Sequence, residues 1–151
     1  MDMQMDTLKN LANVILPLVG IGLMVSYEVC DTTCSSLAGA LMGLDLKYVG
    51  YSFMGVLLVL AFLRKPPLAE PANVLRTVML AGALGGEVLL VRFQVIHETF
   101  CPFCLAFGLC LLALFAVNAR TMNRYLAGVS FLAGIAFFYL FFEGSVLSLY
   151  S

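Results

Sequence analysis

Hydrophobic positions along the chain fall into five long runs, and polar or charged positions gather in the short segments between them. The runs span about residues 11–27, 48–63, 75–96, 101–117 and 125–147. Each is close to the roughly 17–25 residues that a helix needs to cross the hydrocarbon core of a membrane. Backbone groups in lipid must pair internally, so the runs are expected to be helices and not strands. The pattern predicts five transmembrane helices.

Composition supports the same class of protein. The 151 residues are 62% hydrophobic and only 11% charged, and the mean hydropathy is +1.02. A soluble domain carries about 25% charged residues, so this chain has too few polar side chains to cover its own surface. The net charge of -1 gives no electrostatic reason to expect nucleic-acid binding. We therefore expect an all-α integral membrane protein that contacts lipid.

The basic residues predict an orientation. Six of the eight lie before the first run, between the second run and the start of the third, or between the fourth and fifth. These six are Lys9, Arg64, Lys65, Arg76, Arg120 and Arg124. Basic residues near membrane-spanning helices concentrate on the cytoplasmic side. We expect a multi-pass protein of the inner (cytoplasmic) membrane, with its N-terminus in the cytoplasm and its C-terminus outside.

Four of the five cysteines form two pairs that this orientation brings to the outer face. Cys30 and Cys34 follow the first run, and Cys101 and Cys104 open the fourth. Disulfides persist on the oxidising side of a membrane. Cys101 suits an N-cap and Pro102 the first helical position, which places Cys104 about one turn along on the same face. Amide N–H groups and the helix dipole favour a thiolate there.

The two pairs suggest a relay, because thiol–disulfide exchange requires direct attack of one sulfur on another. The loop pair could collect electrons from a soluble protein, and the C-x-x-C pair could pass them to an acceptor dissolved in lipid. Two other interpretations are a zinc site made by four cysteines and a pair of structural disulfides. The C-x-x-x-C spacing is less usual for zinc, and a C-x-x-C disulfide closes too small a loop to stabilise much. We predict no metal site, and we interpret Cys110 as a packing residue.

The chain resembles the vitamin K epoxide reductase (VKOR) family, in its bacterial disulfide-forming branch. The resemblance rests on the loop pair Cys30 and Cys34, the segment GLDLKYVGYSFMG at 43–55, and CPFC at 101–104. It implies a four-helix transmembrane bundle around a quinone, with a fifth peripheral transmembrane helix. Bacterial members often continue into a thioredoxin-like domain. We expect a single membrane domain over 1–151 without that domain, and a separate thioredoxin-like (DsbA-like) partner outside the cytoplasm.

The resemblance also implies roles for the four cysteines. Cys30 would exchange with the partner, Cys34 would bridge to Cys101, and Cys104 would face and attack the quinone, of the ubiquinone, menaquinone or vitamin K type. The implied activity is a membrane thiol–quinone oxidoreductase that supports disulfide-bond formation. One alternative is a DsbB-type quinone reductase, in which the C-x-x-C pair comes first in the chain. The other is a non-enzymatic subunit whose cysteines form structural disulfides.

Six further residues are candidates for the site. Phe103, Phe107 and Tyr51 are expected to border the quinone. Glu87, in the middle of an apolar run, is a candidate proton donor because an ionisable group at that depth is costly. The only histidine, His97, could polarise a thiol or move a proton. Arg92 could stabilise a thiolate or a quinone anion. Each of the last three also has a non-catalytic interpretation. Glu87 could be a hydrogen-bonded packing residue, His97 a solvated surface residue, and Arg92 a side chain that extends to the membrane interface.

Overall fold

The computed structural model describes residues 2–30, 37–63 and 65–146, so Cys34 and Arg64 lie outside the described residues. The prediction of five helices is confirmed, although the first and third begin earlier than predicted, at Asp2 and Ala69 and not near residues 11 and 75. They are α1 (Asp2–Val29), α2 (Leu46–Phe62), α3 (Ala69–Ile96), α4 (Pro102–Asn118) and α5 (Arg124–Phe141). A 3-10 turn (Ala119–Thr121) follows α4. The helices α1, α3, α4 and α5 are long and apolar enough to cross a membrane, whereas α2 is shorter, at 17 residues.

Side-chain caps determine where two of the helices begin. The Asp45 carboxylate accepts a hydrogen bond from the backbone N–H of Lys47, 3.2 Å away, at the start of α2. The side-chain oxygen of Asn123 accepts from the N–H groups of Tyr125 and Leu126, at 3.0 and 3.3 Å. These bonds satisfy N–H groups that have no partner within the first turn of a helix.

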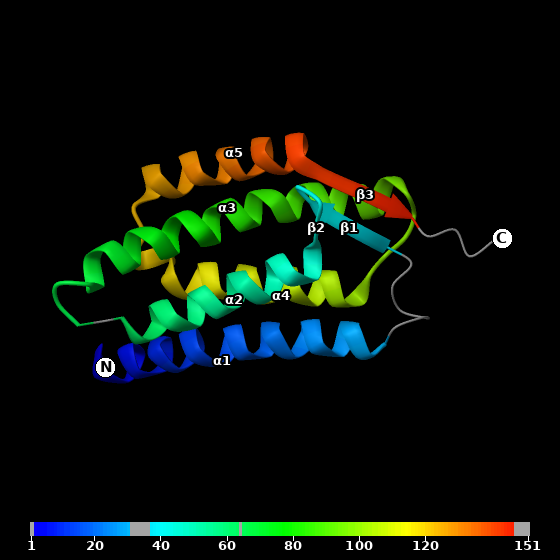
Figure 1. The fold of residues 1–151 in the computed structure, drawn as a ribbon. Coiled ribbons are helices and arrows are strands. Elements are labelled where there is room, and N and C mark those ends of the chain that lie inside the picture. Colours follow the sequence, from blue (N-terminus) through cyan, green and yellow to red (C-terminus); the bar gives the residue numbers. More distant parts are fainter. Residues whose placement is uncertain (1, 31–36, 64, 147–151) are drawn as a thin grey trace.

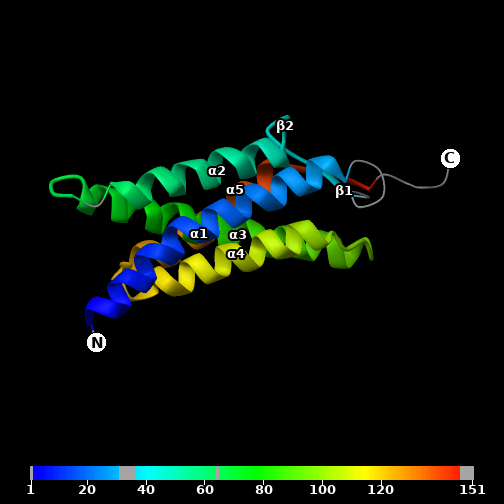
Figure 2. The same cartoon turned by 90° about the horizontal axis from the view of Figure 1, so that it is seen from below.

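The helices run side by side and define two ends of the bundle (Figures 1 and 2). One end carries the start of α1 and the α2–α3 and α4–α5 connections (Figure 1). We call it the basic end, because Lys9, Lys65, Arg120 and Arg124 lie there. The opposite end, which we call the cysteine end, carries the close of α1 and the start of α4. The basic and cysteine-bearing segments are therefore separated as the charge pattern predicts.

A small antiparallel sheet at the cysteine end was not predicted. Its strands are β1 (Leu37–Leu41), β2 (Leu44–Asp45) and β3 (Phe142–Val146), in the order β2-β1-β3. The prediction that the fifth helix reaches residue 147 is wrong, because the helix ends at Phe141 and the chain continues as β3. The backbone of β3 pairs with β1 along its whole length. Hydrophobicity does not separate a short strand from a helix end, so the pattern missed this change.

A tight turn joins β1 to β2. Met42 and Gly43 both have positive φ values, 54° and 79°. Two consecutive residues in this conformation connect antiparallel strands with the twist that a hairpin needs, and glycine adopts it without strain. The hairpin leads directly into Asp45, the cap of α2, so the sheet and α2 are joined without an intervening loop.

The apolar core lies between α2, α3 and α4, toward the basic end. Its buried members are Met54, Leu57, Leu60, Ala72, Leu80, Cys110, Leu111, Leu114 and Met122. Cys110 lies in this cluster, as expected for a packing residue. Next to the core, Asn13 of α1 and Asn118 of α4 exchange two side-chain hydrogen bonds, of 3.1 and 2.7 Å. Both amides are buried, and each satisfies the other across the two helices.

The helix α5 packs against α3 at one side of the bundle (Figure 1). Glycines allow the two backbones to approach closely: a Cβ atom on Gly134 would collide with the Gly82 carbonyl, and one on Gly85 with the Phe131 carbonyl. Small residues play this role where helices meet in lipid. The rest of α5 carries large exposed apolar side chains, among them Leu132 and Leu140, which is typical of a surface that faces lipid.

Candidate functional site

A cavity of about 550 Å³ lies within the bundle toward the cysteine end. All five helices contribute to its wall, and each of the three strands adds one residue. The lining is largely apolar and includes several phenylalanine rings. Its volume falls in the range of about 300–1,000 Å³ that is typical of small-molecule sites. The cavity can therefore hold an apolar ligand of moderate size.

The C-x-x-C pair stands at the edge of this cavity. Cys101 is the N-cap of α4 and Pro102 takes the first helical position, as predicted. Cys104 lies one turn further and lines the cavity, whereas Cys101 is only 1% exposed and is not part of the lining. Both are free thiols, and their sulfurs are joined by a hydrogen bond. The arrangement presents one thiol to the cavity and keeps the second directly behind it.

Gln94 fixes the position of Cys101, and the sequence analysis missed this residue. Its side-chain oxygen accepts a hydrogen bond from the backbone N–H of Cys101 at 2.9 Å, and its side chain is 2% exposed. Its backbone carbonyl accepts from the N–H of Thr99 at 3.0 Å. Gln94 thus ties the end of α3 to the start of α4. The available signal was a polar residue inside an apolar run, seven positions before a reactive cysteine.

The surroundings of Cys101 favour its thiolate. Cys101 lies just before Pro102–Thr121, a segment that is long and apolar enough to cross a membrane. The hydrogen bond from Cys104 lowers the pKa of the Cys101 thiol, and the backbone N–H groups of Cys104 and Phe103 lower it further, against the opposing effect of burial. The Cys101 side chain accepts no capping hydrogen bond from these N–H groups. They therefore stabilise the thiolate mainly through their partial positive charges. The thiolate is therefore stabilised on the cysteine behind the cavity wall.

We predict that one cysteine of the reduced protein ionises below the ordinary cysteine pKa of about 8.5. A thiol is charged above its pKa, so a lowered pKa extends the thiolate to lower pH. Thiolate absorbance in the ultraviolet, recorded against pH, would measure it. Cys104→Ala removes the hydrogen-bond donor and should move the midpoint to higher pH, whereas Cys104→Ser keeps a donor and Cys110→Ala is the control. An unchanged midpoint in Cys104→Ala would contradict the assignment.

The end of α1 lies against the start of α4. The rings of Tyr27 and Phe103 meet edge to face, with centroids 6.0 Å apart. Cys30 comes three residues after Tyr27 and is disulfide-bonded. The structure therefore brings the helix end that carries Cys30 to the helix start that carries Cys101 and Cys104. The predicted role of Cys34 falls outside the described residues.

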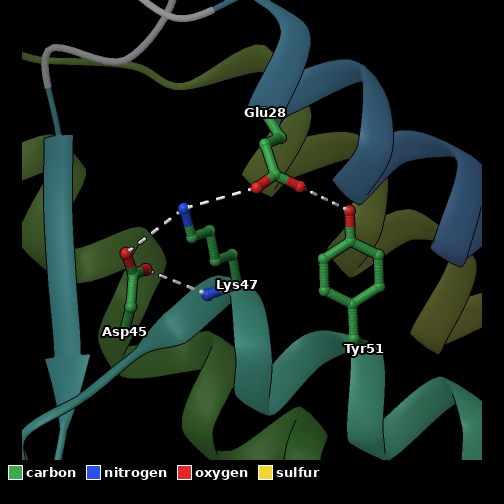
Figure 3. A network of polar contacts seen from close by, with 4 residues as sticks. All are labelled: Glu28, Asp45, Lys47 and Tyr51. Atoms are coloured by element: carbon green, nitrogen blue, oxygen red, sulfur yellow. Dashed lines mark hydrogen bonds and ion pairs between the residues drawn. The ribbon is translucent and has the colours of Figure 1, made fainter.

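A polar network holds α1 to α2 at the same end (Figure 3). Lys47 Nζ lies 3.8 Å from Glu28 Oε1 and 3.9 Å from Asp45 Oδ2. The hydroxyl of Tyr51 donates to Glu28 Oε2 at 3.3 Å. Lys47 and Asp45 also line the cavity, which the sequence analysis did not anticipate. Exposed ion pairs contribute about 0–1 kcal/mol, so the network positions the helix ends more than it stabilises the fold.

The predicted ligand-contacting residues divide into two groups. Phe103 and Phe107 line the cavity together with Cys104. Tyr51 points instead to Glu28 (Figure 3) and is not one of the lining residues.

Of the three residues predicted to donate a proton or stabilise a charge, one lines the cavity and two do not. Glu87 lines the cavity, and its Oε1 is buried with no hydrogen-bond partner among the described residues. His97 caps α3: its Nδ1 lies 2.9 Å from the Phe93 carbonyl oxygen, and its exposed ring lies against the Phe93 ring. Arg92 is exposed and does not line the cavity. Among the three, only Glu87 reaches the space beside Cys104.

Within the described part of the chain, no group of three or more His, Cys, Asp or Glu side chains is arranged to hold a metal ion. Comparisons of the chain with protein-family models, curated proteins and solved structures found no match.

Proposed function

We propose that this protein is a membrane thiol–quinone oxidoreductase, of the VKOR-like type that its cysteine pattern resembles. The observation that carries the proposal is the placement of Cys104. A free thiol with a second thiol hydrogen-bonded to it lines an apolar cavity in a bundle of helices that are apolar enough for lipid. Such a pair can give two electrons to an oxidant in the cavity by closing a disulfide.

The lining fits the head group of a quinone. Phe103 and Phe107 offer aromatic faces beside the reactive sulfur, and the cavity has room for a bicyclic ring. The buried Glu87 Oε1 lacks a partner within the described structure, and a ligand carbonyl could supply one. A bound quinone supplies an acceptor for two electrons and two protons. Cys104 is the residue placed to react with it, and Cys101 is placed to close the Cys101–Cys104 bond.

Electrons would enter through the loop pair. The disulfide of Cys30 lies beyond the last turn of α1, which contacts the start of α4 through Tyr27 and Phe103. A thioredoxin-like partner with two thiols would reduce this disulfide. The freed loop thiol, which we assign to Cys34, would then attack Cys101 once the C-x-x-C pair is oxidised. The partner would leave oxidised and able to make disulfides in other proteins.

We propose that the cysteine end faces the outside of the inner membrane and the basic end faces the cytoplasm. The separation of the two ends in the bundle and the concentration of basic residues at one of them support this orientation. A purely structural role for the C-x-x-C pair is less well supported, because Cys104 lines the cavity and a C-x-x-C disulfide would close too small a loop to stabilise much. The order of the pairs along the chain argues against a DsbB-type protein.

The test is reduction of menadione, a naphthoquinone with no isoprenoid tail, by purified protein in detergent. One series uses a reduced thioredoxin-like protein as electron donor and a second uses a small dithiol. We expect the wild type to turn over with both donors. Cys30→Ala and Cys34→Ala should lose activity with the protein donor and keep it with the small dithiol. A wild type that reduces no quinone with either donor would refute the proposed function.

A further inference from the structure

Glu87 stands between two hollows in the protein. It lines the main cavity, and it also lines a second groove of about 490 Å³ between α3 and α4. The other residues of that groove are apolar, among them Leu84, Leu105 and Leu112. A carboxyl group in apolar surroundings is costly to ionise and costly to leave without a hydrogen bond. A carboxyl group in such surroundings is a candidate for a chemical role.

The carboxyl lies next to the reactive thiol. It rests against Gly108, where any side chain would collide with it. Gly108 is one helical turn after Cys104, so the two positions share one face of α4. Glu87 and Cys104 line the same cavity. The packing that brings α3 and α4 together at Gly108 therefore places the glutamate beside the sulfur.

Other groups that could exchange a proton here are less well placed. Lys47 and Asp45 line the cavity but form an ion pair with each other (Figure 3). Gln94 lines it but does not ionise, and its side-chain oxygen accepts from Cys101. The lining residues with a hydroxyl group are Tyr27, on α1, and Ser130, on α5, and a hydroxyl group is a much weaker acid than a carboxyl group. Glu87 is the one acidic lining residue whose carboxyl oxygen remains unbonded within the described structure.

We propose that Glu87 is the proton donor of this site: its carboxyl group hydrogen-bonds a carbonyl oxygen of the bound quinone and transfers a proton to it. This inference rests on the proposed function. Formation of the Cys101–Cys104 bond releases two electrons and the two thiol protons. The quinone takes up two electrons and two protons. Glu87 gives one proton to one quinone oxygen and regains one from the Cys104 thiol, so it ends in its starting state. The other quinone oxygen takes its proton from solvent, to which the Cys101 thiol releases its own proton when it ionises.

The experiment compares wild type, Glu87→Gln and Glu70→Gln. Glu70 is an exposed glutamate in the first turn of the same helix, so its variant is a matched control. Pre-reduced protein is mixed with menadione, and a single turnover is followed. General acid catalysis contributes typically 10²–10⁴-fold, so we expect Glu87→Gln to be slowed roughly 100-fold or more. Menadione affinity should change only a few-fold, because glutamine keeps the size of the side chain and can still donate a hydrogen bond.

A second readout does not depend on turnover. Infrared difference spectra, recorded when menadione binds to oxidised protein, should show a shift in a carboxylic acid C=O band. The band should be absent from Glu87→Gln and present in Glu70→Gln. The wild-type spectrum tests the proposal even if Glu87→Gln fails to fold. If menadione shifts no carboxylic acid band in the wild type, the proposal is overturned.

The outcomes distinguish failure of the Glu87 proposal from failure of the proposed quinone-reductase function. A wild type that reduces menadione while Glu87→Gln is equally fast, or while no carboxylic acid band shifts, would refute the role of Glu87 and leave the proposed function standing. A wild type that neither binds nor reduces menadione would refute both.

Discussion

Cys104→Ala is expected to abolish quinone reduction with every donor, because Cys104 is the thiol that the cavity wall exposes. Cys101 is 1% exposed and lies behind it, so it cannot take over the reaction. Turnover of menadione should fall to the background rate, with the small dithiol as well as with the protein donor. Loss with both donors distinguishes this step from the entry step, where only the protein donor should fail.

The matched control is Cys110→Ala on the same helix. Cys110 lies in the apolar core and not in the cavity wall, so its removal should lower stability modestly and leave turnover intact. Thermal unfolding of both variants would exclude a general loss of fold. Turnover retained by Cys104→Ala, or lost equally in Cys110→Ala, would show that the thiol at the cavity is not the reacting group.

Gly134→Leu is expected to have the second large effect, on the fold and the cavity together. A side chain at position 134 would collide with the α3 backbone at Gly82, so α5 must move away from α3. Overpacking of this kind costs about 1–3 kcal/mol of stability. Because α5 supplies part of the cavity wall, the displacement should also weaken menadione binding. Thermal unfolding in detergent and quenching of protein fluorescence by menadione would measure the two effects.

Gly128→Leu is the control for this prediction. Gly128 lies on the same helix, and a Cβ atom there would meet no other atom within 4 Å. Both substitutions raise helix propensity by a similar amount, so a difference between them reports the contact with α3. Equal stability and equal menadione binding in the two variants would show that close packing of α5 does not shape the cavity.

The sequence predicted the helices because most of each one is an apolar run. The polar first turns of α1 and α3 were missed, because apolar length marks only the part of a helix that could lie in lipid. The start of α4 was predictable to the residue, since Cys101 and Pro102 carry a local signal for a helix start. The ends that turn into strands were not. The segment Phe142–Val146 pairs with Leu37–Leu41 from the other half of the chain. This pairing depends on the tertiary structure, and no local sequence pattern in either segment predicts it.

The candidate site shows the same division. The reactive pair was visible in its spacing, and Phe103 and Phe107 were found because they flank Cys104 on one helix. Gln94 was not found, because its importance comes from one hydrogen bond across the α3–α4 turn. Tyr51 was expected at the quinone, but its hydroxyl is bonded to Glu28. The fifth helix was expected to be peripheral; it does lie at the side of the bundle, yet it also forms cavity wall. Such contributions depend on how helices pack, which hydrophobicity does not encode.

The pairing of β1 with β3 has a consequence for biosynthesis. A ribosome makes β1 soon after the first helix, but β3 follows the fifth helix, so β1 waits without its partner while the four helices α2 to α5 are made. Each strand of the sheet contributes to the lining of the cavity, so its cover at the cysteine end is completed late in translation. Until then, a nascent chain would hold Cys104 in a chamber that lacks the part of its wall supplied by α5 and β3.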